Sequence, residues 1–244
     1  MNVFLITGCS GFVGRHFVSY LRESALPYKV YGIDLVVPDW LLEFPELNFT
    51  KGDLANFDFI NQILLESKPT YILHLASFSS VAFSWKDPVS SFMNNTNIFL
   101  NLVENIRLNR LKTRVLSVGS SEEYGMIRAE ELPVIESKIP FPLNPYAVAR
   151  YSQELLSNVY CRGFNLDIIL TRSFNHVGVG QRDDFVIPSI TKQMVSAMKL
   201  GKKIIKLNVG DVSIIRDFVD VSDVVRAYHD LFFKGKTGSV YNIC

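Results

Sequence analysis

The sequence has few cysteines and no long apolar run. Its three cysteines, Cys9, Cys161 and Cys244, are odd in number and far apart, which argues against a disulfide framework and a structural zinc site, so no metal is expected. No stretch approaches the roughly 18 apolar residues of a membrane-spanning helix. The apolar start lacks the basic segment and small-residue cleavage site of a signal peptide. These absences favour a protein of a reducing cytoplasm with no membrane partner.

The sequence also lacks an excess of either charge. Lysine and arginine total 25, aspartate and glutamate 24, and the net charge is +1. This balance provides no electrostatic field for a nucleic acid or an anionic membrane. Apolar residues make up 48% and charged residues 20% of the 244 positions, which is typical of a globular protein. The length suits one large domain, or a core domain with a small inserted lobe.

A glycine-rich turn lies near the start of the chain. Residues 3–6 read as an apolar strand, and glycines at positions 8, 11 and 14 accompany the opening of a helix at position 12. The first glycine would permit the sharp turn. The second would allow a pyrophosphate to approach the backbone closely, and the third would allow the helix to pack tightly on the strand. The helix N-terminus would add unpaired N–H groups and a positive dipole end. The pattern predicts a dinucleotide site, an ordinary glycine-rich turn being the alternative. The residues expected to line the site are Gly8, Ser10, Gly11, Phe12, Val13 and Gly14.

Two carboxylates follow the next two predicted strands. Residues 28–33 read as a strand, and Asp34 comes directly after it, about 20 residues beyond the turn, where a carboxylate can accept hydrogen bonds from the adenosine ribose. A 2′-phosphate would meet that carboxylate, so Asp34 favours NAD over NADP as the cofactor. Asp53 follows a short strand over 47–51; it would either reach the adenine edge or cap the next helix.

Strand and helix patterns then alternate. Apolar strands are expected over 71–75 and 113–118, and helices over 56–67 and 88–109. Continuously apolar strands separated by helices predict an α/β fold with a doubly wound parallel sheet of the Rossmann type. His74 ends one strand and reads as a packed rather than a catalytic histidine. The small residues after it lie where such a sheet admits a ligand. The cofactor set therefore extends to Asp53, Leu54, Leu75, Ala76 and Ser77.

A serine and a tyrosine are placed to share one active-site floor. Ser120 follows the strand over 113–118, and Tyr146 opens a helix after a proline-rich loop. Tyr146 and Arg150 stand at i and i+4, on one helix face. A phenol with an ordinary pKa near 10 needs a nearby cation to act as an acid or base at neutral pH. The alternative is a surface Tyr/Arg pair.

Five motifs carry a resemblance to a known family. They are GSSEEYG (119–125), NPYAVAR (144–150), RSFNHVGVGQ (172–181), RDFVDVSDVVRAY (216–228) and VYNIC (240–244). Over essentially all of its length the chain resembles the extended short-chain dehydrogenases/reductases, which include the NAD-dependent epimerases/dehydratases. Within them it is most similar to the GDP-4-keto-6-deoxy-mannose reductases, sister enzymes of GDP-mannose 4,6-dehydratase.

The resemblance implies a domain organisation. It gives a Rossmann domain over 1–175, a substrate-binding lobe over 176–216, and a helix and strand over 217–244 that return to the core. A lobe strand is expected over 204–207, a helix over 221–233 and a sheet strand over 240–243. Relatives continue beyond residue 244, so either the lobe is curtailed or the sequence is a fragment. A homodimer is expected.

The resemblance also implies residue roles. Ser120 would hydrogen-bond the substrate C4 oxygen, and Tyr146, supported by Arg150, would exchange a proton with it while nicotinamide moves a hydride. Asn95 would support a proton-relay water, and Glu122 stands where the related dehydratases place their elimination base. The residues that would bind a nucleoside-diphosphate sugar, GDP-linked in the resemblance, are Ser121, Asn175, Gln181 and Arg216, the arginine meeting the diphosphate.

One departure from the family pattern bears on turnover. The family's Tyr-x-x-x-Lys is here Tyr146-x-x-x-Arg150, and a planar guanidinium is not equivalent to a compact ammonium on the nicotinamide ribose. The expected function is NAD(P)H-dependent reduction of a 4-keto-6-deoxy nucleotide sugar, with weakened turnover. A 4,6-dehydratase or 4-epimerase is the alternative on the same scaffold. A cofactor-binding regulatory protein with impaired catalysis is the third possibility, and Arg150 motivates it.

Overall fold

The computed structural model describes residues 2–24, 27–201 and 204–244. Its centre is a seven-stranded sheet in the order β3-β2-β1-β4-β5-β6-β9, with every neighbouring pair parallel. The strands are β1 Asn2–Thr7, β2 Tyr28–Asp34, β3 Leu47–Lys51, β4 Tyr71–His74, β5 Arg114–Ser120, β6 Asp167–Ser173 and β9 Val240–Ile243. The strand order reverses between β1 and β4, which is where such sheets bind ligands. The predicted Rossmann-type fold is confirmed.

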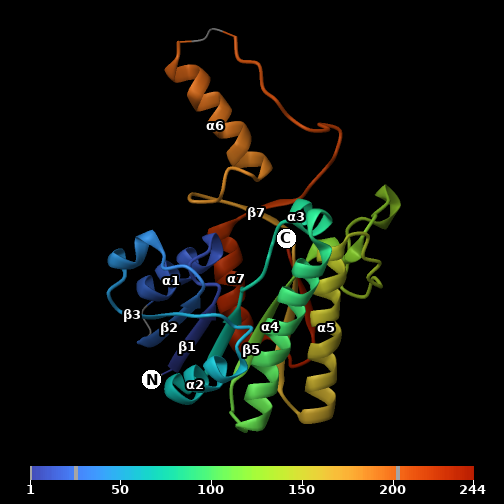
Figure 1. The fold of residues 1–244 in the computed structure, drawn as a ribbon. Coiled ribbons are helices and arrows are strands. Elements are labelled where there is room, and N and C mark those ends of the chain that lie inside the picture. The colour runs from blue at the N-terminus through green and yellow to red at the C-terminus, as the bar shows by residue number, and fades with distance from the viewer. Residues whose placement is uncertain (1, 25–26, 202–203) are drawn as a thin grey trace.

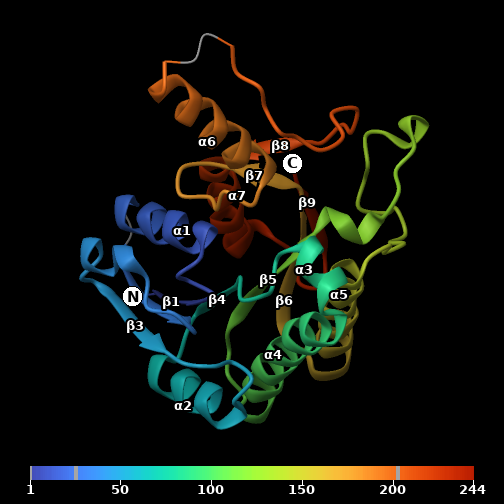
Figure 2. The same ribbon diagram turned by 45° about the horizontal axis from the view of Figure 1, so that its top comes forward.

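Helices cover both faces of the sheet (Figures 1 and 2). They are α1 Phe12–Glu23, α2 Phe57–Ser67, α3 Val81–Lys86, α4 Pro88–Leu108, α5 Pro145–Phe164, α6 Val186–Lys199 and α7 Val221–Lys234. Short 3-10 helices are η1 Asp39–Glu43, η2 Ser121–Tyr124 and η3 Ala129–Glu131. Helices α1 and α7 pack together, as do α2 with α4 and α4 with α5. No helix within the described ranges is long and apolar enough to cross a membrane.

The sheet is buried on both faces, and this explains its continuously apolar strands. Along β1, Phe4 and Ile6 belong to the core under α1 and α7, while Leu5 belongs to the core under α2, α4 and α5. Successive strand residues point to opposite faces, so a strand with two buried faces needs apolar residues at consecutive positions. The aromatic core around Phe4 includes edge-on contacts with Phe17 and Phe232.

A small second sheet lies beyond the carboxyl edge of the main one. It pairs β7 Asn175–Val177 in parallel with β8 Phe218–Asp220. The segment expected to form the lobe, residues 176–216, begins at this pair, and Figure 1 shows α6 standing off the body of the molecule. The strand expected over 204–207 is wrong, because that segment is irregular and pairs with no described strand. Ile204 is 80% exposed, so its side chain gains little from burial there.

Candidate active site

The glycine turn has the close contacts that its residue types require. Gly8 has φ +70°, and a Cβ there would lie 2.7 Å from the backbone of Ala76. A Cβ at Gly14 would collide with the backbone of Cys9, so this glycine packs α1 against the turn after β1 rather than against β1 itself. No side chain caps the α1 N-terminus at Gly11, and its first turn carries no acidic residue. The uncapped N–H groups fit a pyrophosphate.

Asp34 is tied to the glycine turn. Its Oδ2 accepts a hydrogen bond from the Ser10 N–H at 3.0 Å, and its Oδ1 accepts one from the Leu35 N–H at 2.7 Å. The Ser10 hydroxyl in turn donates to the Val36 carbonyl at 2.6 Å. The Val36 N–H also donates to Oδ1, at 3.4 Å. An ionised carboxylate has about four acceptor positions, so Asp34 keeps about one for a ribose hydroxyl beside the glycine turn.

Asp53 and Leu54, the next predicted cofactor residues, make no contact with the glycine turn among the hydrogen bonds of the described residues. Asp53 is exposed and its Oδ1 accepts from the Ala55 N–H at 2.8 Å, while the α2 cap is Asn56, whose side chain accepts from the Phe59 N–H. The expectation that Asp53 caps this helix is therefore wrong. Leu54 is 6% exposed and packs into the core, and its carbonyl accepts from the Asn101 side-chain amide at 3.1 Å.

The segment after β4 lies against the glycine turn. The Leu75 N–H donates to the Thr7 carbonyl at 3.1 Å, and the Ala76 backbone lies against Gly8. The preceding His74 is fully buried with its Nδ1 2.8 Å from the Thr7 hydroxyl. Burial lowers the pKa of His74 to about 3. The sequence predicts a packed histidine at this strand end, and its burial confirms that prediction.

Arg150 and Tyr146 form a buried pair at the start of α5. Arg150 is 4% and Tyr146 7% exposed, so the alternative of a surface pair is wrong. The Arg150 Nε donates to the Tyr146 hydroxyl at 3.3 Å, and its Nη2 donates to the Ser77 hydroxyl. Its Nη1 donates to the Val118 carbonyl at 3.0 Å. The guanidinium thus joins the tyrosine to strand β5 and to the segment after β4, where predicted cofactor residues lie.

Ser120 ends β5, which runs two residues further than the predicted 113–118. Its hydroxyl accepts from the Glu122 N–H at 3.2 Å. The Glu122 carboxylate accepts from the Asn144 side-chain amide at 2.9 Å, and the Asn144 Oδ1 caps α5 by accepting from the Ala147 N–H. The candidate elimination base is therefore linked to the helix that carries Tyr146. Ser121 opens η2 between these residues.

Glu123 is a member of this site that sequence reasoning missed. It is fully buried, and its Oε1 accepts from the Ser120 N–H at 2.8 Å while its Oε2 lies 3.8 Å from the Arg172 guanidinium. Burial raises the pKa of Glu123 to about 8. A Cβ at Gly119 would collide with this carboxylate and with the Thr171 carbonyl. The absence of a side chain at position 119 therefore leaves the space that the carboxylate occupies. The second of two adjacent glutamates in the turn over 119–125 was the available signal.

Asn95 is buried on α4 and clamps the segment after β4. Its Oδ1 accepts from the Phe78 N–H at 2.7 Å, and its Nδ2 donates to the Phe78 carbonyl at 3.1 Å. The oxygen and the nitrogen of the Asn95 amide thus both bind the backbone of Phe78. A contact with a proton-relay water stays a prediction.

The predicted substrate residues flank the small sheet. The Asn175 amide donates to the Asp217 carbonyl at 3.1 Å, and the Gln181 amide donates to the His176 carbonyl at 2.9 Å. Arg216 is exposed, and within the described part of the chain its guanidinium hydrogen-bonds only the Ile215 carbonyl, at 3.0 Å. The His176 ring stacks on Phe12 of α1, at 6.3 Å between centroids. The segment expected to form the lobe thus begins against the first residue of α1.

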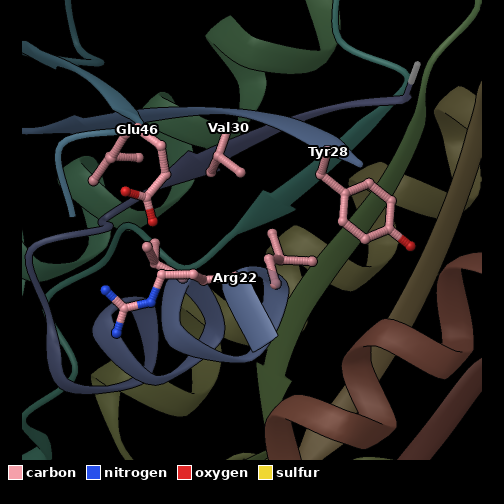
Figure 3. Close-up of a pocket in the computed structure, with 7 residues that line it drawn as sticks. Arg22, Tyr28, Val30 and Glu46 are labelled. Carbon is pink, nitrogen blue, oxygen red and sulfur yellow. The ribbon is translucent and has the colours of Figure 1, made fainter. Parts of the chain in front are cut away.

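A separate small pocket lies at the opposite edge of the sheet (Figure 3). It is lined by Leu21, Arg22, Tyr28, Val30 and Glu46, near the amino ends of β2 and β3, and holds about 40 Å³. Since one water needs about 10–15 Å³ of volume measured in this way, the pocket has room for a few waters and not for a nucleotide. The carboxyl edge carries the candidate site.

Comparison with known proteins agrees with this geometry. A model of the GDP-mannose 4,6 dehydratase family matches residues 5–244. The chain belongs to the GDP-mannose 4,6-dehydratase family. The resemblance to the extended short-chain dehydrogenases/reductases, which include the NAD-dependent epimerases/dehydratases, is thereby confirmed.

Relatives in this family have several named activities. GDP-6-deoxy-D-mannose reductase of Pseudomonas aeruginosa is 34% identical over 98% of this chain and 73% of its own length. GDP-6-deoxy-D-talose 4-dehydrogenase of Aggregatibacter actinomycetemcomitans is 32% identical with the same coverage. The solved structure of RMD from Pseudomonas aeruginosa complexed with NADPH has a TM-score of 0.86 at 33% identity, covering 100% of this chain and 78% of that one. DesIV, a dTDP-glucose 4,6-dehydratase from Streptomyces venezuelae with NAD bound, has a TM-score of 0.87 at 26% identity, covering 99% and 75%.

Proposed function

We propose that this protein is a nucleotide-sugar 4-ketoreductase that reduces the C4 keto group of a GDP-linked 4-keto-6-deoxy sugar. The observation that carries the proposal is the Tyr146 phenol held against a buried guanidinium at the carboxyl edge of the sheet, the same edge at which the uncapped N-terminus of α1 lies. The similarity to a GDP-6-deoxy-D-mannose reductase supports both the reaction and the GDP-linked substrate.

The chain's residues divide the work of the reduction. Bound nicotinamide would supply the hydride for the sugar C4. Tyr146 would donate its phenolic proton to the C4 oxygen, and the positive charge of Arg150 would stabilise the phenolate that remains. The Ser120 hydroxyl, whose position is set by the Glu122 N–H, would hydrogen-bond the same oxygen. Arg216 would meet the diphosphate as a charged fork.

We infer NAD rather than NADP as the preferred cofactor. The Asp34 carboxylate is fixed beside the turn by the Ser10 and Leu35 N–H groups. A 2′-phosphate at the ribose would meet this negative charge, whereas ribose hydroxyls can donate to it. Solved relatives bind either NADPH or NAD, so the family alone does not decide the preference. A homodimer located in the cytoplasm is also part of this proposal.

A 4,6-dehydratase is the second candidate, and Glu122 is the observation that favours it. Its carboxylate lies at the end of β5 and is hydrogen-bonded by Asn144 at 2.9 Å. A carboxylate there could remove a proton from the sugar during elimination, as the relative DesIV is named for dehydration.

Product mass separates the candidates. Purified protein is incubated with NADH or NADPH and with GDP-, dTDP- and UDP-sugars, each in its parent and its 4-keto-6-deoxy form. Ketoreduction adds two hydrogens to the keto sugar and consumes the reduced cofactor. Dehydration removes one water from the parent sugar without net cofactor consumption. Binding of the cofactor without turnover of any sugar would instead support a regulatory protein.

A further inference from the structure

The Arg150 guanidinium is buried, and neutral acceptors hold it. Its Nη1 donates at 3.0 Å both to the Val118 carbonyl and to the Gln153 Oε1, while Nε and Nη2 donate to the Tyr146 and Ser77 hydroxyls. No carboxylate forms an ion pair with Arg150 within the ranges that the structure describes. With both Nη1 hydrogens taken, the plane of the guanidinium is fixed by Val118 and Gln153.

Gln153 is itself anchored to the sheet. It is 1% exposed, and its Nε2 donates to the Ser117 hydroxyl of β5 at 2.7 Å. The crevice lined by Ser117, Arg150 and Gln153 is too narrow for a water molecule. Since hydrogen bonds in a dry, low-dielectric environment are stronger than in water, the amide is a rigid bridge between β5 and the guanidinium.

Two consecutive residues of α5, Gln153 and Glu154, bind different arginines. Glu154, next to Gln153, pairs with Arg172 at 2.7 Å rather than with Arg150. A carboxylate at position 153 would offset the charge of Arg150, whereas the amide fixes its orientation and leaves the charge directed at the phenol.

We propose that Gln153 is a positioning residue, which holds the Arg150 guanidinium against the Tyr146 hydroxyl through its bridge to Ser117. The inference rests on the proposed ketoreductase function, because it assigns Gln153 a part in that chemistry. It also makes a claim about Tyr146 that can be measured without turnover.

The test is a double-mutant cycle of Gln153→Met and Arg150→Lys. Methionine keeps the size of glutamine and removes its acceptor and donor. We expect Gln153→Met to lower kcat about tenfold in the Arg150 protein, the size of a lost hydrogen bond to a charged group, with little change in KM. In the Arg150→Lys protein the same change should lower kcat by less than about twofold, because the guanidinium that Gln153 holds is already absent.

Nuclear magnetic resonance of ring-labelled tyrosine gives a second measurement on the same four proteins. The Tyr146 signal is identified by its loss in Tyr146→Phe. It should move on Gln153→Met only when residue 150 is arginine. Gln153→Glu should preserve the anchoring but shift the pH–rate profile to higher pH, because the new carboxylate offsets the guanidinium charge. Ser117→Ala, which removes only the support under Gln153, should give a smaller loss of kcat in the same direction, and serves if Gln153→Met fails to fold.

The outcomes separate this inference from the proposed function. Equal costs of Gln153→Met in both backgrounds, with an unmoved Tyr146 signal, would overturn the positioning role and leave a structural one. If the parent protein turns over no sugar, the proposed function fails, and the Tyr146 signal alone then decides whether Gln153 positions Arg150.

Discussion

The Arg150 Nε lies 3.3 Å from the Tyr146 hydroxyl oxygen, and both side chains are more than nine-tenths buried. The sequence alone predicts that arginine, replacing a compact ammonium, slows turnover through poor geometry. In the structure three further acceptors hold the guanidinium, on Ser77, Val118 and Gln153. This anchoring favours a working Tyr146/Arg150 pair over an impaired one.

Asp34 should set the cofactor preference. We expect the protein to bind NADH more tightly than NADPH, and Asp34→Asn to narrow that preference by about tenfold, or about 1.4 kcal/mol, by removing the negative charge near a 2′-phosphate. Titration calorimetry with both cofactors measures it. Equal or tighter binding of NADPH by the parent protein would remove this role from Asp34.

Arg216 should bind the diphosphate of the substrate. Arg216→Ala is expected to weaken binding of a nucleoside-diphosphate sugar by about 1.5–3 kcal/mol, the size of a hydrogen bond to a charged group. Arg182→Ala is the matched control, because Arg182 is an exposed arginine of the same lobe that already pairs with Asp184 at 2.8 Å. An unchanged affinity in Arg216→Ala, or an equal loss in the control, would place the diphosphate elsewhere.

Glu123 should make the stability of the protein depend on pH. Burial raises its pKa from 4.5 to about 8, so between these values the folded protein holds a proton that the unfolded chain has lost. The free energy of unfolding therefore falls as pH rises towards 8. His74, with its pKa lowered from 6.5 to about 3, acts in the opposite direction below pH 6.5. Denaturant unfolding between pH 6.5 and 8 therefore measures the effect of the Glu123 carboxyl on the free energy of unfolding without the opposing effect of His74.

Glu123→Gln is the variant for this measurement. Its free energy of unfolding should change less with pH across that window than that of the parent protein. Parallel pH dependences in the two proteins would show that Glu123 does not hold its proton in the folded state.

Gly119 should be required by the packing around Glu123. A Cβ there collides with the Glu123 carboxylate and the Thr171 carbonyl, so Gly119→Ala is expected to lower the free energy of unfolding by about 1–3 kcal/mol. The control is Gly163→Ala in α5, where a Cβ meets nothing within 4 Å, and where alanine should stabilise by up to about 1 kcal/mol. Denaturant unfolding of both variants provides the comparison; a harmless Gly119→Ala would mean that the carboxylate can move aside.

The fold could be predicted because its signals are local. The apolar strands, the glycine turn and the α1 start at Phe12 depend on residues close in sequence, and the structure confirms them. The strand expected over 204–207 failed because its apolar pattern is matched by no partner strand in the described structure. A strand needs pairing that the pattern itself does not reveal.

The candidate site was only partly predictable for a similar reason. Tyr146 and Arg150 share a helix face, so their contact follows from spacing. The contact between Gln153 and Ser117 joins residues 36 positions apart, on a helix and a strand. Asn144 caps α5 and also contacts Glu122, a pairing of residues 22 positions apart that is visible only in the folded chain. Such supporting residues emerge from packing, not from a motif.

The rate of NADH oxidation with a GDP-4-keto-6-deoxy sugar tests the proposed function most directly, measured for the parent protein, Arg150→Lys and Tyr146→Phe. We expect turnover by the parent. Arg150→Lys should be slower by about tenfold, since an ammonium cannot satisfy the fixed acceptors on Val118 and Gln153 together with the phenol. Tyr146→Phe should lose at least about a hundredfold, the contribution of a general acid. A parent protein without turnover, or a Tyr146→Phe protein as fast as the parent, would contradict the assignment of this site.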